Sequence, residues 1–250
     1  MYLLYFFKKT LKSCFYFFKS LFIYLPNFFV QYFQLKKQKS ERFPIQLKNI
    51  HPCLTDASKS TPFDQHYTYH PAWAARVLQQ LNPTLHVDVS SILSFSSIVS
   101  AFVPTKFYDY RPAKLVLQNF ESDFIDLKKM HFADNAIESI SCMHTIEHIG
   151  LGRYGDALDI NGDITAINEL QRVTAVGGTI IFVTPVGKPT LAFNAHRIYS
   201  YQQIISYFNK CTVSEFSLIP DEGGLLLNAD HNLVALQNYG CGCFVFKKTN

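Results

Sequence analysis

Two histidines and a glutamate lie close together in the segment His144-Thr-Ile-Glu147-His148. The H-x-x-E-H spacing is the one that inverted zinc peptidases use, because two imidazoles and a carboxylate on one helical turn can hold a metal and supply a general base. The same residues would also suit the segment that follows a strand of an α/β domain. The secondary structure predicted around these side chains distinguishes a zinc site from a segment that follows a strand.

Helices and strands alternate along the chain from about residue 70. Apolar periodicity with an Asn-Pro or Gly-Gly stop predicts helices, and short apolar or alternating runs predict strands. The predicted helices cover residues 70–83, 92–102, 162–178 and 201–209, and the predicted strands cover residues 85–91, 105–112, 135–143, 179–187, 211–219 and 240–248. This alternation predicts a parallel, doubly wound α/β sheet with helices on both faces.

Polar residues follow several of the predicted strands. Asp88 closes the first strand, Asp109 ends the second, and the stretches 142–156 and 185–197 follow two later ones. Ligands of open α/β sheets bind at the carboxyl ends of the strands, near the switch point. We therefore expect these residues to meet at one binding site.

Four stretches, in order, carry a family resemblance: HVDVSS, FYDYRP, DLKKMHFADNAIESISCMHTIEHI and GDITAINELQRVTAVGGTIIFVTPVG. Through them, residues 50–248 resemble the class I S-adenosylmethionine-dependent methyltransferases. Within that superfamily the resemblance is closest to an uncharacterised bacterial domain-of-unknown-function family, family 268. It implies a Rossmann-like, seven-stranded doubly wound sheet, S-adenosyl-L-methionine as the cofactor and methyl transfer as the reaction.

The resemblance also implies cofactor-binding residues. Asp109 stands where the family has the acid that accepts hydrogen bonds from both ribose hydroxyls. Asp126 stands where a side chain accepts a hydrogen bond from the adenine amino group. Met143 and His144 are expected to lie over the cofactor, and Asp88 to orient the loop that faces the methionine moiety.

The sequence departs from the family in the glycine loop. Where the family has D-x-G, the chain has Asp88-Val89-Ser90, and no glycine follows through Ser100. A glycine there adopts positive φ and lets the backbone approach the cofactor. Ser90 takes this place among the expected cofactor-binding residues. The alternative is a non-catalytic, methyltransferase-like binding protein that has lost the cofactor.

The place of the H-x-x-E-H motif after the fourth strand changes the chemistry expected of it. A zinc peptidase needs a third carboxylate ligand on a downstream helix, and Glu169 is the only nearby acid on a clear helix. We therefore expect no metal, and expect His144 or His148 to act as general base for a hydroxyl acceptor. The alternative is that both histidines cap or pack the helix.

Polar stretches beside the expected site are candidates for acceptor binding. The loop 150–163 is either a lid or a plain surface loop, and residues 60–70, with His66 and Tyr67, precede the first predicted helix. The residues expected to bind the substrate are Arg153, Tyr154, Asn194, His196 and Arg197. The expected acceptor is a small molecule, or a hydroxyl on a glycan or lipid-linked intermediate.

Positive charge is concentrated at the N-terminus. Residues 1–42 hold eight Lys and Arg against one acid, which leaves −3 for the remainder of a chain whose net charge is +4. A nucleic-acid-binding domain would carry its basic patch on the folded part, so we expect no nucleic acid partner. The six cysteines form no C-x-x-C pair, which favours reduced thiols in a cytoplasmic protein.

The first 40 residues hold 14 of the 38 aromatic residues, interleaved with lysines. Their longest uncharged run, 20–35, is shorter than a spanning helix needs. We expect residues 1–42 to form a helical extension on the inner face of a membrane, with 43–84 as a lead-in and 85–250 as the methyltransferase-like domain. The alternatives are a helix packed on the domain or on a second subunit, and a short spanning segment.

Overall fold

The computed structural model describes residues 18–38 and 42–250, so the predictions for residues 1–17 and 39–41 lie outside the described residues. The chain divides into two compact units, Met1–Phe63 and Asp64–Asn250. The second unit begins well before residue 85, because the helix that starts at Gln65 packs against the sheet.

In the described part of the first unit, residues 18–38 and 42–63, the longest helix has several turns. A π-helical turn, Ser20–Tyr24, leads into α2, Leu25–Lys37, and a 3-10 turn follows at Leu47–Asn49. A proline in the first turn of α2 costs no hydrogen bond, and Lys36 and Lys37 in its last turn lie at the negative end of the helix dipole. The exposed apolar side chains of α2 are Phe29, Val30, Phe33 and Leu35.

Within residues 18–38 and 42–250, no helix has both the length and the apolar content that crossing a membrane requires.

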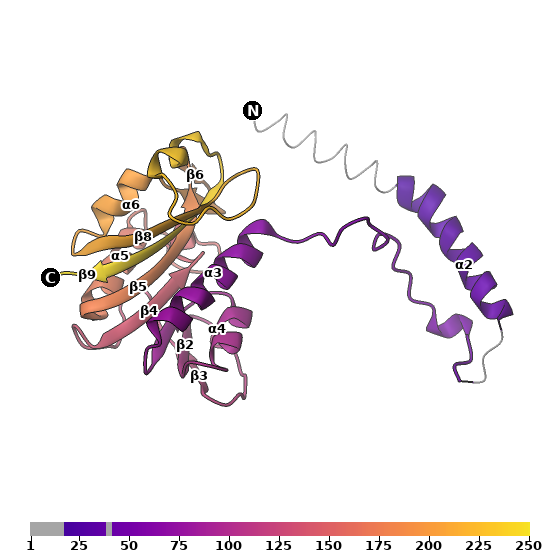
Figure 1. Ribbon diagram of the computed structural model, residues 1–250, viewed down its shortest axis with the longest axis horizontal. Helices are drawn as coiled ribbons and strands as arrows, with labels where there is room; N and C mark the ends of the chain where they lie inside the picture. The colour runs from indigo at the N-terminus through magenta and orange to yellow at the C-terminus, as the bar shows by residue number, and fades with distance from the viewer. Residues whose placement is uncertain (1–17, 39–41) are drawn as a thin grey trace. The chain divides into compact units, whose positions relative to one another are not determined.

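Seven strands of the second unit form one sheet in the order β3-β2-β1-β4-β5-β9-β8 (Figure 1). The strands are β1 His86–Val89, β2 Thr105–Asp109, β3 Phe120–Phe124, β4 Ile137–Met143, β5 Thr174–Val186, β8 Cys211–Ile219 and β9 Gly240–Lys248. The other elements are α3 Gln65–Leu81, α4 Leu93–Val99, α5 Gly162–Val173, α6 Tyr201–Tyr207, the 3-10 turns η3 Ile146–His148 and η4 His231–Leu236, and the two-stranded ribbon of β6 Thr190–Ala192 and β7 His196–Ile198. The predicted Rossmann-like, seven-stranded architecture is confirmed.

The sheet is mixed rather than fully parallel, which corrects the sequence-based prediction. Strands β1 to β5 pair in parallel, whereas β9 runs antiparallel to both β5 and β8. The connection from β8 to β9 contains only η4 and loops. Neighbouring strands that are joined without a crossover helix run in opposite directions.

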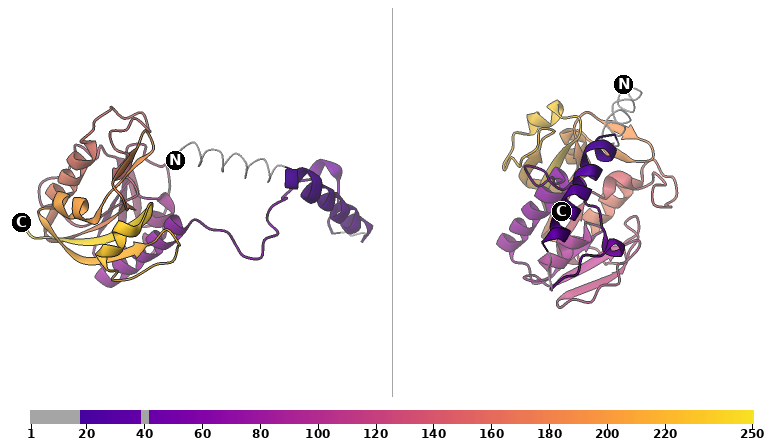
Figure 2. Two further views of the ribbon diagram at one scale, coloured as in Figure 1. Left: turned by 90° about the horizontal axis from the view of Figure 1, so that it is seen from above. Right: turned by 90° about the vertical axis from the view of Figure 1, so that its right-hand side faces the viewer.

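Helices cover both faces of the sheet, and each face has its own core (Figures 1 and 2). Along β5, Ile180 and Phe182 pack in the core that includes α5 and α6, while Ile181 and Val183 pack in the core that includes α3 and α4. The alternation follows from the two-residue period of a strand. A buried apolar run such as that of β5 is therefore apolar on both faces.

Some element boundaries differ from the sequence-based prediction. Helix α5 ends at Val173, because the chain enters β5 at Thr174, three residues before the Gly177-Gly178 pair that was expected to stop the helix. Those glycines lie at an irregularity in the β4–β5 pairing, where Gly177 has φ +78°. Strand β3 was not predicted, because only the first of its five residues is buried and the strand therefore carries no apolar pattern.

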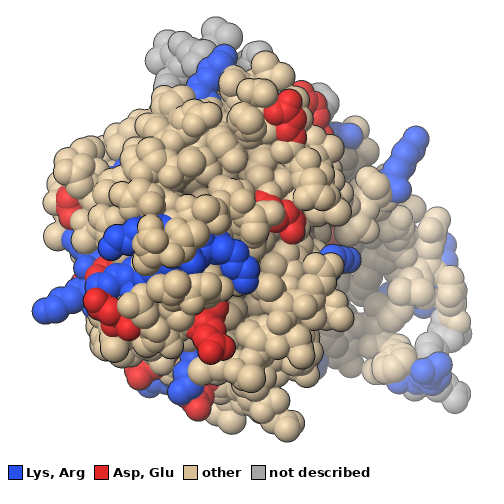
Figure 3. All heavy atoms as spheres, turned by 60° about the vertical axis from the view of Figure 1, so that its left-hand side comes forward, with Lys and Arg blue, Asp and Glu red and all other residues tan. Residues whose placement is uncertain are grey.

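Basic and acidic side chains lie side by side on the face that Figure 3 shows. Helix α5 carries one such pairing of opposite charges: Arg172 contacts Glu169 at 2.6 Å and Asp134 at 2.7 Å. Glu169 also accepts a hydrogen bond from the backbone N–H of Met130 at 2.7 Å. The acid considered as a downstream zinc ligand is thus engaged in fastening α5 to the loop before β4.

A buried polar network joins the two central strands. Asp88 of β1 is fully buried, and its carboxylate accepts hydrogen bonds from the hydroxyls of Ser96 on α4 and Ser141 on β4, the latter at 2.6 Å. His86 contacts Ser141 Oγ at 2.9 Å through Nε2 and Ser139 Oγ at 2.9 Å through Nδ1. Burial raises the pKa of Asp88 to about 6, against an ordinary value of 3.8.

We expect Asp88→Asn to change how stability depends on pH. Because the pKa of Asp88 is raised to about 6 on folding, its contribution to stability is full below about pH 4 and is lost as the pH rises through about 6. Asparagine has no proton to lose, so the free energy of unfolding of the variant, relative to the parent, should rise by about 3 kcal/mol from about pH 4 to about pH 8. Urea unfolding of both proteins across this range measures the difference, and a difference that does not vary with pH would contradict the expectation.

Candidate active site

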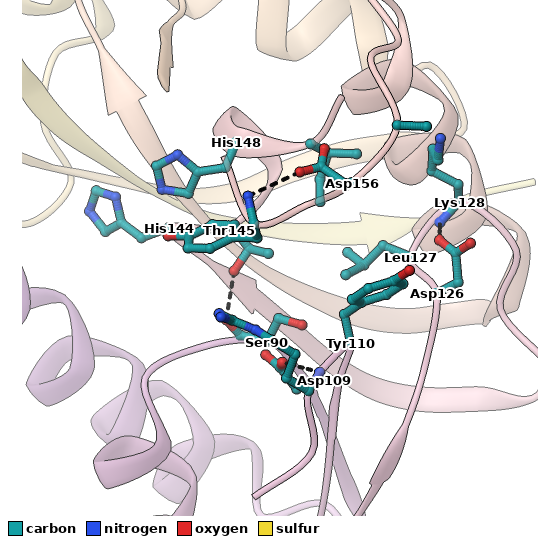
Figure 4. Close-up of a pocket in the computed structure, with 14 residues that line it drawn as sticks. Ser90, Asp109, Tyr110, Asp126, Leu127, Lys128, His144, Thr145, His148 and Asp156 are labelled. Carbon is teal, nitrogen blue, oxygen red and sulfur yellow. Dashed lines mark hydrogen bonds between the residues drawn. The ribbon is translucent and has the colours of Figure 1, made fainter. Parts of the chain in front are cut away.

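A cavity of about 280 Å³ lies at the carboxyl ends of the central strands (Figure 4). Its walls are formed by Ser90, Asp109, Tyr110, Arg111, Asp126, Leu127, Lys128, His144, Thr145, His148, Ile149, Tyr154, Asp156 and Ala157. Because the carboxyl ends of parallel strands share one edge of the sheet, residues far apart in the sequence meet here. The cavity contains both predicted catalytic histidines and three of the five predicted cofactor residues.

Two carboxylates stand on one side of the cavity. Asp109 ends β2, and its Oδ1 accepts a hydrogen bond from the backbone N–H of Arg111 at 2.7 Å. Asp126 follows β3, and its Oδ1 accepts one from the backbone N–H of Lys128 at 2.9 Å. Each hydrogen bond fixes its carboxylate in a local turn, and neither Oδ2 has a hydrogen bond to the described residues. These two oxygens are available to donors of a ligand.

Ser90 keeps the backbone conformation that a glycine would favour. Its φ is +56°, in the left-handed region, and its N–H donates to Tyr108 O at 2.7 Å. The carbonyl of Ser90 accepts a hydrogen bond from Thr145 Oγ1 at 2.7 Å (Figure 4). Ser91 Oγ accepts one from Met143 N at 3.1 Å. The loop thus has a positive φ without glycine and is pinned to the segments on either side.

Two of the predicted cofactor residues do not line this cavity. Asp88 is enclosed in the network beneath the loop, where its carboxylate orients Ser96 and Ser141 rather than facing the cavity. Met143 is 1% exposed, and its side chain belongs to the core between the sheet and α3–α4. Its neighbour Thr145, which the sequence analysis did not single out, lies in the wall instead.

His144 is held at both ring nitrogens. Its Nδ1 lies 2.9 Å from Glu147 Oε1, and its Nε2 lies 3.3 Å from Cys241 Sγ. Burial alone would raise the pKa of Glu147, but the hydrogen bond from His144 and the charges of His144 and His148 outweigh it and hold the pKa below its ordinary value. Glu147 is therefore an anion that accepts the Nδ1–H of His144.

His148 presents a free nitrogen to the site. Its Nδ1 lies 2.6 Å from Ala195 O, and because a carbonyl can only accept, this nitrogen carries the proton. Arg153 Nη1 lies 3.2 Å from the same nitrogen, but it donates to Ala195 O at 3.0 Å. Nε2 then has a lone pair, and burial lowers the pKa of His148, so the ring is neutral at pH 7. Geometry favours His148 over His144 as a general base.

A second cavity of about 500 Å³ adjoins the first and shares His144 and His148 with it. Its other walls are Tyr67, Glu147, Arg153, Asn194, Ala195, His196 and Tyr239. Burial raises the pKa of Tyr67 to about 12 and that of Tyr239 to about 12, so both phenols remain hydrogen-bond donors at neutral pH. Three of the five predicted substrate residues, Arg153, Asn194 and His196, line this cavity.

The other two predicted substrate residues lie elsewhere. Tyr154 lines the first cavity, with the guanidinium groups of Arg111 and Arg153 at 4.8 and 5.1 Å from its ring centroid. Arg197 is 6% exposed and donates to Ile149 O at 2.7 Å and to Ile160 O at 3.1 Å. Arg197 therefore fixes both ends of the loop 150–160 and does not line the second cavity.

Several site residues carried no signal in the sequence. Arg111 and Thr145 lie next to residues that were predicted, but nothing in their own spacing indicates a role. Tyr239 lies just before β9 and Cys241 is its second residue, in a part of the chain with no motif. They join the site because β9 lies beside β5 in the sheet.

One group of the described residues has the side chains and spacing to hold a metal ion: His66, His144 and Cys241. His148 is not in that group. The two histidines of the H-x-x-E-H motif therefore do not converge as a pair of peptidase ligands.

Comparison with known proteins extends these observations. The family model described as "Caenorhabditis protein of unknown function, DUF268" matches residues 108–211, which include Asp109, Asp126 and the H-x-x-E-H motif. This match confirms the resemblance to that family. No curated protein matches the sequence.

Solved structures match over more than two thirds of this chain. The YcgJ protein of Bacillus subtilis has a TM-score of 0.52 and 10% identity, over 73% of this chain and 99% of its own. The 1,6-didemethyltoxoflavin-N1-methyltransferase of Burkholderia thailandensis was solved with 1,6-didemethyltoxoflavin and S-adenosylhomocysteine. It has a TM-score of 0.51 and 9% identity, over 73% of this chain and 79% of its own. A candidate sarcosine dimethylglycine methyltransferase of Galdieria sulphuraria has a TM-score of 0.53 and 10% identity, over 72% and 84%.

The fold is that of a class I methyltransferase. The TM-scores above 0.5 establish the architecture, whereas identities near 10% do not establish the chemistry, which depends on the residues of this chain. In this methyltransferase fold, the cavity with Asp109 and Asp126 lies at the carboxyl ends of β1, β2 and β4, at the switch point of the strand order.

We expect His148 to be neutral at pH 7 and to carry its proton on Nδ1. The reason is the hydrogen bond from Nδ1 to Ala195 O, with a pKa lowered by burial. Long-range ¹H–¹⁵N spectra of histidine-labelled protein distinguish the two tautomers, and the spectrum of His148→Gln assigns the signal. The charged form should appear only below the ordinary pKa of 6.5. A ring that carries its proton on Nε2, or that is charged at pH 7, would exclude His148 as a base.

Proposed function

We propose that this protein is an S-adenosylmethionine-dependent methyltransferase. One observation carries the proposal: in a class I methyltransferase fold, Asp109, Asp126 and the neutral imidazole of His148 line a single cavity at the switch point. Two carboxylates and a base so arranged suit a nucleoside with hydroxyl and amino donors, next to an acceptor that must lose a proton.

The residues present fit the cofactor. The Oδ2 atoms of Asp109 and Asp126 have no hydrogen bond to the described residues, and the backbone at Ser90 has the positive φ of a glycine loop. Asp109 would accept hydrogen bonds from the ribose hydroxyls, and Asp126 would accept one from the adenine amino group. S-adenosyl-L-methionine, when bound, supplies an electrophilic methyl group.

Catalysis would rest mainly on positioning. The two cavities meet at His144 and His148, so an acceptor in the second cavity would reach the cofactor past these residues. Alignment of the two reactants removes much of the entropic barrier. His148 Nε2 would take the proton of the acceptor, while the hydrogen bond from Nδ1 to Ala195 O keeps the ring in the required tautomer.

The acceptor we propose is a hydroxyl compound, such as a glycan or a lipid-linked intermediate. The second cavity combines aromatic rings with polar groups, since Tyr67, Tyr239 and His196 share its wall with Asn194 and Arg153. Aromatic rings with hydrogen-bonding tips suit amphipathic, hydroxyl-rich ligands.

A second candidate function is a non-catalytic binding protein with a methyltransferase fold. It is favoured by one feature, the side chains of Ser90 and Ser91 in the loop where the family has glycine. A side chain at this loop reduces the clearance that the backbone needs to approach a cofactor.

We further propose that residues 1–42 place the protein on the inner face of a membrane. In the described part of this segment, apolar side chains of α2 are exposed, and lysine amino groups lie near aromatic rings: Lys19 is 5.3 Å from the Tyr24 centroid, and Lys36 is 5.9 Å from that of Tyr32. Aromatic rings at the headgroup level with lysines beside lipid phosphates are typical of interfacial helices.

We expect the protein to bind S-adenosylhomocysteine, and Asp109→Ala to weaken binding by about ten- to a hundredfold. Loss of a charge-assisted hydrogen bond in which the ligand donors are left unpaired costs about 1.5–3 kcal/mol. Asp109→Asn, which still accepts from Arg111 N–H, should also weaken binding. Calorimetry measures all of these affinities, with Asp123→Ala, an exposed carboxylate on the neighbouring strand, as the control.

Ser90→Gly should bind at least as tightly as the parent protein, because glycine adopts φ +56° without strain. Parent protein without affinity at millimolar ligand, together with binding by Ser90→Gly, would favour the non-catalytic function instead.

We expect the full-length protein to sediment with vesicles that contain anionic lipid, and more weakly at high salt, because salt screens the lysines. The chain that lacks residues 1–42 should remain in the supernatant. Lys36→Gln combined with Lys37→Gln tests the charge contribution, because both lysines lie in the last turn of α2. Equal sedimentation of the shortened chain would show that these residues are not the anchor.

A further inference from the structure

Three potential metal ligands converge beside the second cavity. His66 lies in the first turn of α3, His144 follows β4, and Cys241 is on β9. One ligand atom of each lies within 4.8 Å of the other two. A shared metal is a simple reason for two imidazoles and a thiol from three separate elements to face one point in a largely buried place.

His144 has the orientation that a metal ligand requires. Its Nδ1 proton is directed to Glu147 Oε1 at 2.9 Å, which leaves the lone pair of Nε2 facing Cys241 Sγ at 3.3 Å. Metal-binding histidines commonly donate their second nitrogen to a carboxylate in this way, which fixes the ring and increases its basicity. Glu147 therefore occupies the supporting position behind the ligand.

The surroundings of Glu147 favour a cation nearby. The Glu147 side chain is 1% exposed, and its Oε2 has no hydrogen-bond partner among the described residues. A buried carboxylate with an unpartnered oxygen is costly unless positive charge compensates it. A divalent cation held by His144 would supply that charge through the imidazole.

His66 is the third potential ligand, and two contacts position it. Asp64 caps the helix by accepting the N–H of Tyr67 at 2.9 Å, which fixes the turn that carries His66. The ring of His66 is stacked between those of His144 and Tyr239, with centroids at 5.4 and 5.2 Å. It is closer to the solvent than the other two ligands, so it can adjust toward a bound ion.

We propose that His66, His144 and Cys241 form a Zn²⁺ site with one open coordination position. Zinc bonds of about 2.0–2.1 Å to nitrogen and 2.3 Å to sulfur place tetrahedral donors about 3.5 Å apart, close to the observed 3.3 Å between Cys241 and His144. Two nitrogens, one thiolate and a vacant fourth position are a donor set typical of reactive zinc sites. His148 is not a member of this group of converging ligand atoms.

The open position would face the second cavity, whose wall includes His144, Tyr67 and Tyr239. A Lewis acid there would make an acceptor hydroxyl more acidic, close to the neutral His148. This role rests on the proposed methyltransferase function, whereas the binding of zinc does not.

The test uses full-length protein, stripped with a chelator and kept reduced. Zinc titration against a chromophoric chelator should give one site per chain, and Co²⁺ should give a thiolate charge-transfer band with the visible bands of tetrahedral cobalt. Cys241→Ser and His66→Asn should each abolish the charge-transfer band or weaken zinc binding more than a hundredfold. Glu147→Gln should weaken it by about 10- to 100-fold, as loss of a supporting carboxylate does.

Two matched controls come from the same chain. Cys211→Ser removes a half-buried thiol of β8 outside the group, and His148→Gln removes the other histidine of the motif; both should retain parent affinity. Thermal unfolding verifies that each variant is folded. Absence of zinc binding in the folded parent, or full binding by folded Cys241→Ser, would overturn the proposal. Loss of zinc in folded His148→Gln would overturn it in favour of peptidase-type ligation.

Calorimetry with S-adenosylhomocysteine separates this proposal from the proposed function. Asp109→Ala should keep the zinc site and lose affinity for the nucleoside, and His66→Asn should do the reverse. Zinc binding without nucleoside binding would leave the metal site standing and reject the methyltransferase. Nucleoside binding without zinc would reject the metal site alone.

Discussion

A carboxylate buried at the centre of the sheet constrains the geometry of the whole site. Asp88 has no exposure to solvent, and hydroxyls from Ser96 on α4 and Ser141 on β4 satisfy its oxygens. Loss of either partner would leave a buried oxygen unpaired, at a cost of about 1–3 kcal/mol. The network therefore holds α4, β1 and β4 in one arrangement. The segments that follow β1 and β4 start from these fixed strand ends, so the network also fixes where they begin.

The replacement of glycine by Ser90 becomes understandable against this rigid base. A left-handed φ is unfavourable for a residue with a Cβ, by about 1–2 kcal/mol. Hydrogen bonds from Ser90 N to Tyr108 O and from Thr145 Oγ1 to Ser90 O, both 2.7 Å, hold the loop in place and offset that cost. Glycine supplies the conformation by its freedom, whereas here neighbouring segments impose it. The side chain, and not the backbone, is what distinguishes this loop from that of the family.

The two histidines of the motif differ in how they contact the buried Glu147. Glu147 accepts the proton of His144 Nδ1 at 2.9 Å, and its charge lies 3.8 Å from His148 Nε2. His144 is thereby fixed with Nε2 toward Cys241, while His148 is anchored through Ala195 O and keeps a free nitrogen. The spacing that suggests paired peptidase ligands instead places one histidine toward β9 and the other toward the open cavity.

The resemblance to the class I methyltransferases implied a role for Asp126, which follows a strand that was not predicted. The sequence by itself predicted most of the helices and strands, the α/β class of fold, and the positions of Asp109 and the two histidines at strand ends. These follow from local periodicity and from the rule that parallel strands end at a common edge. Only the tertiary structure decided the antiparallel direction of β9, the role of Arg197 in fixing a loop, and the meeting of His66 and Cys241 with His144. These features depend on which strands become neighbours and where side chains point, and contacts between residues far apart in the chain leave no periodic signal in it.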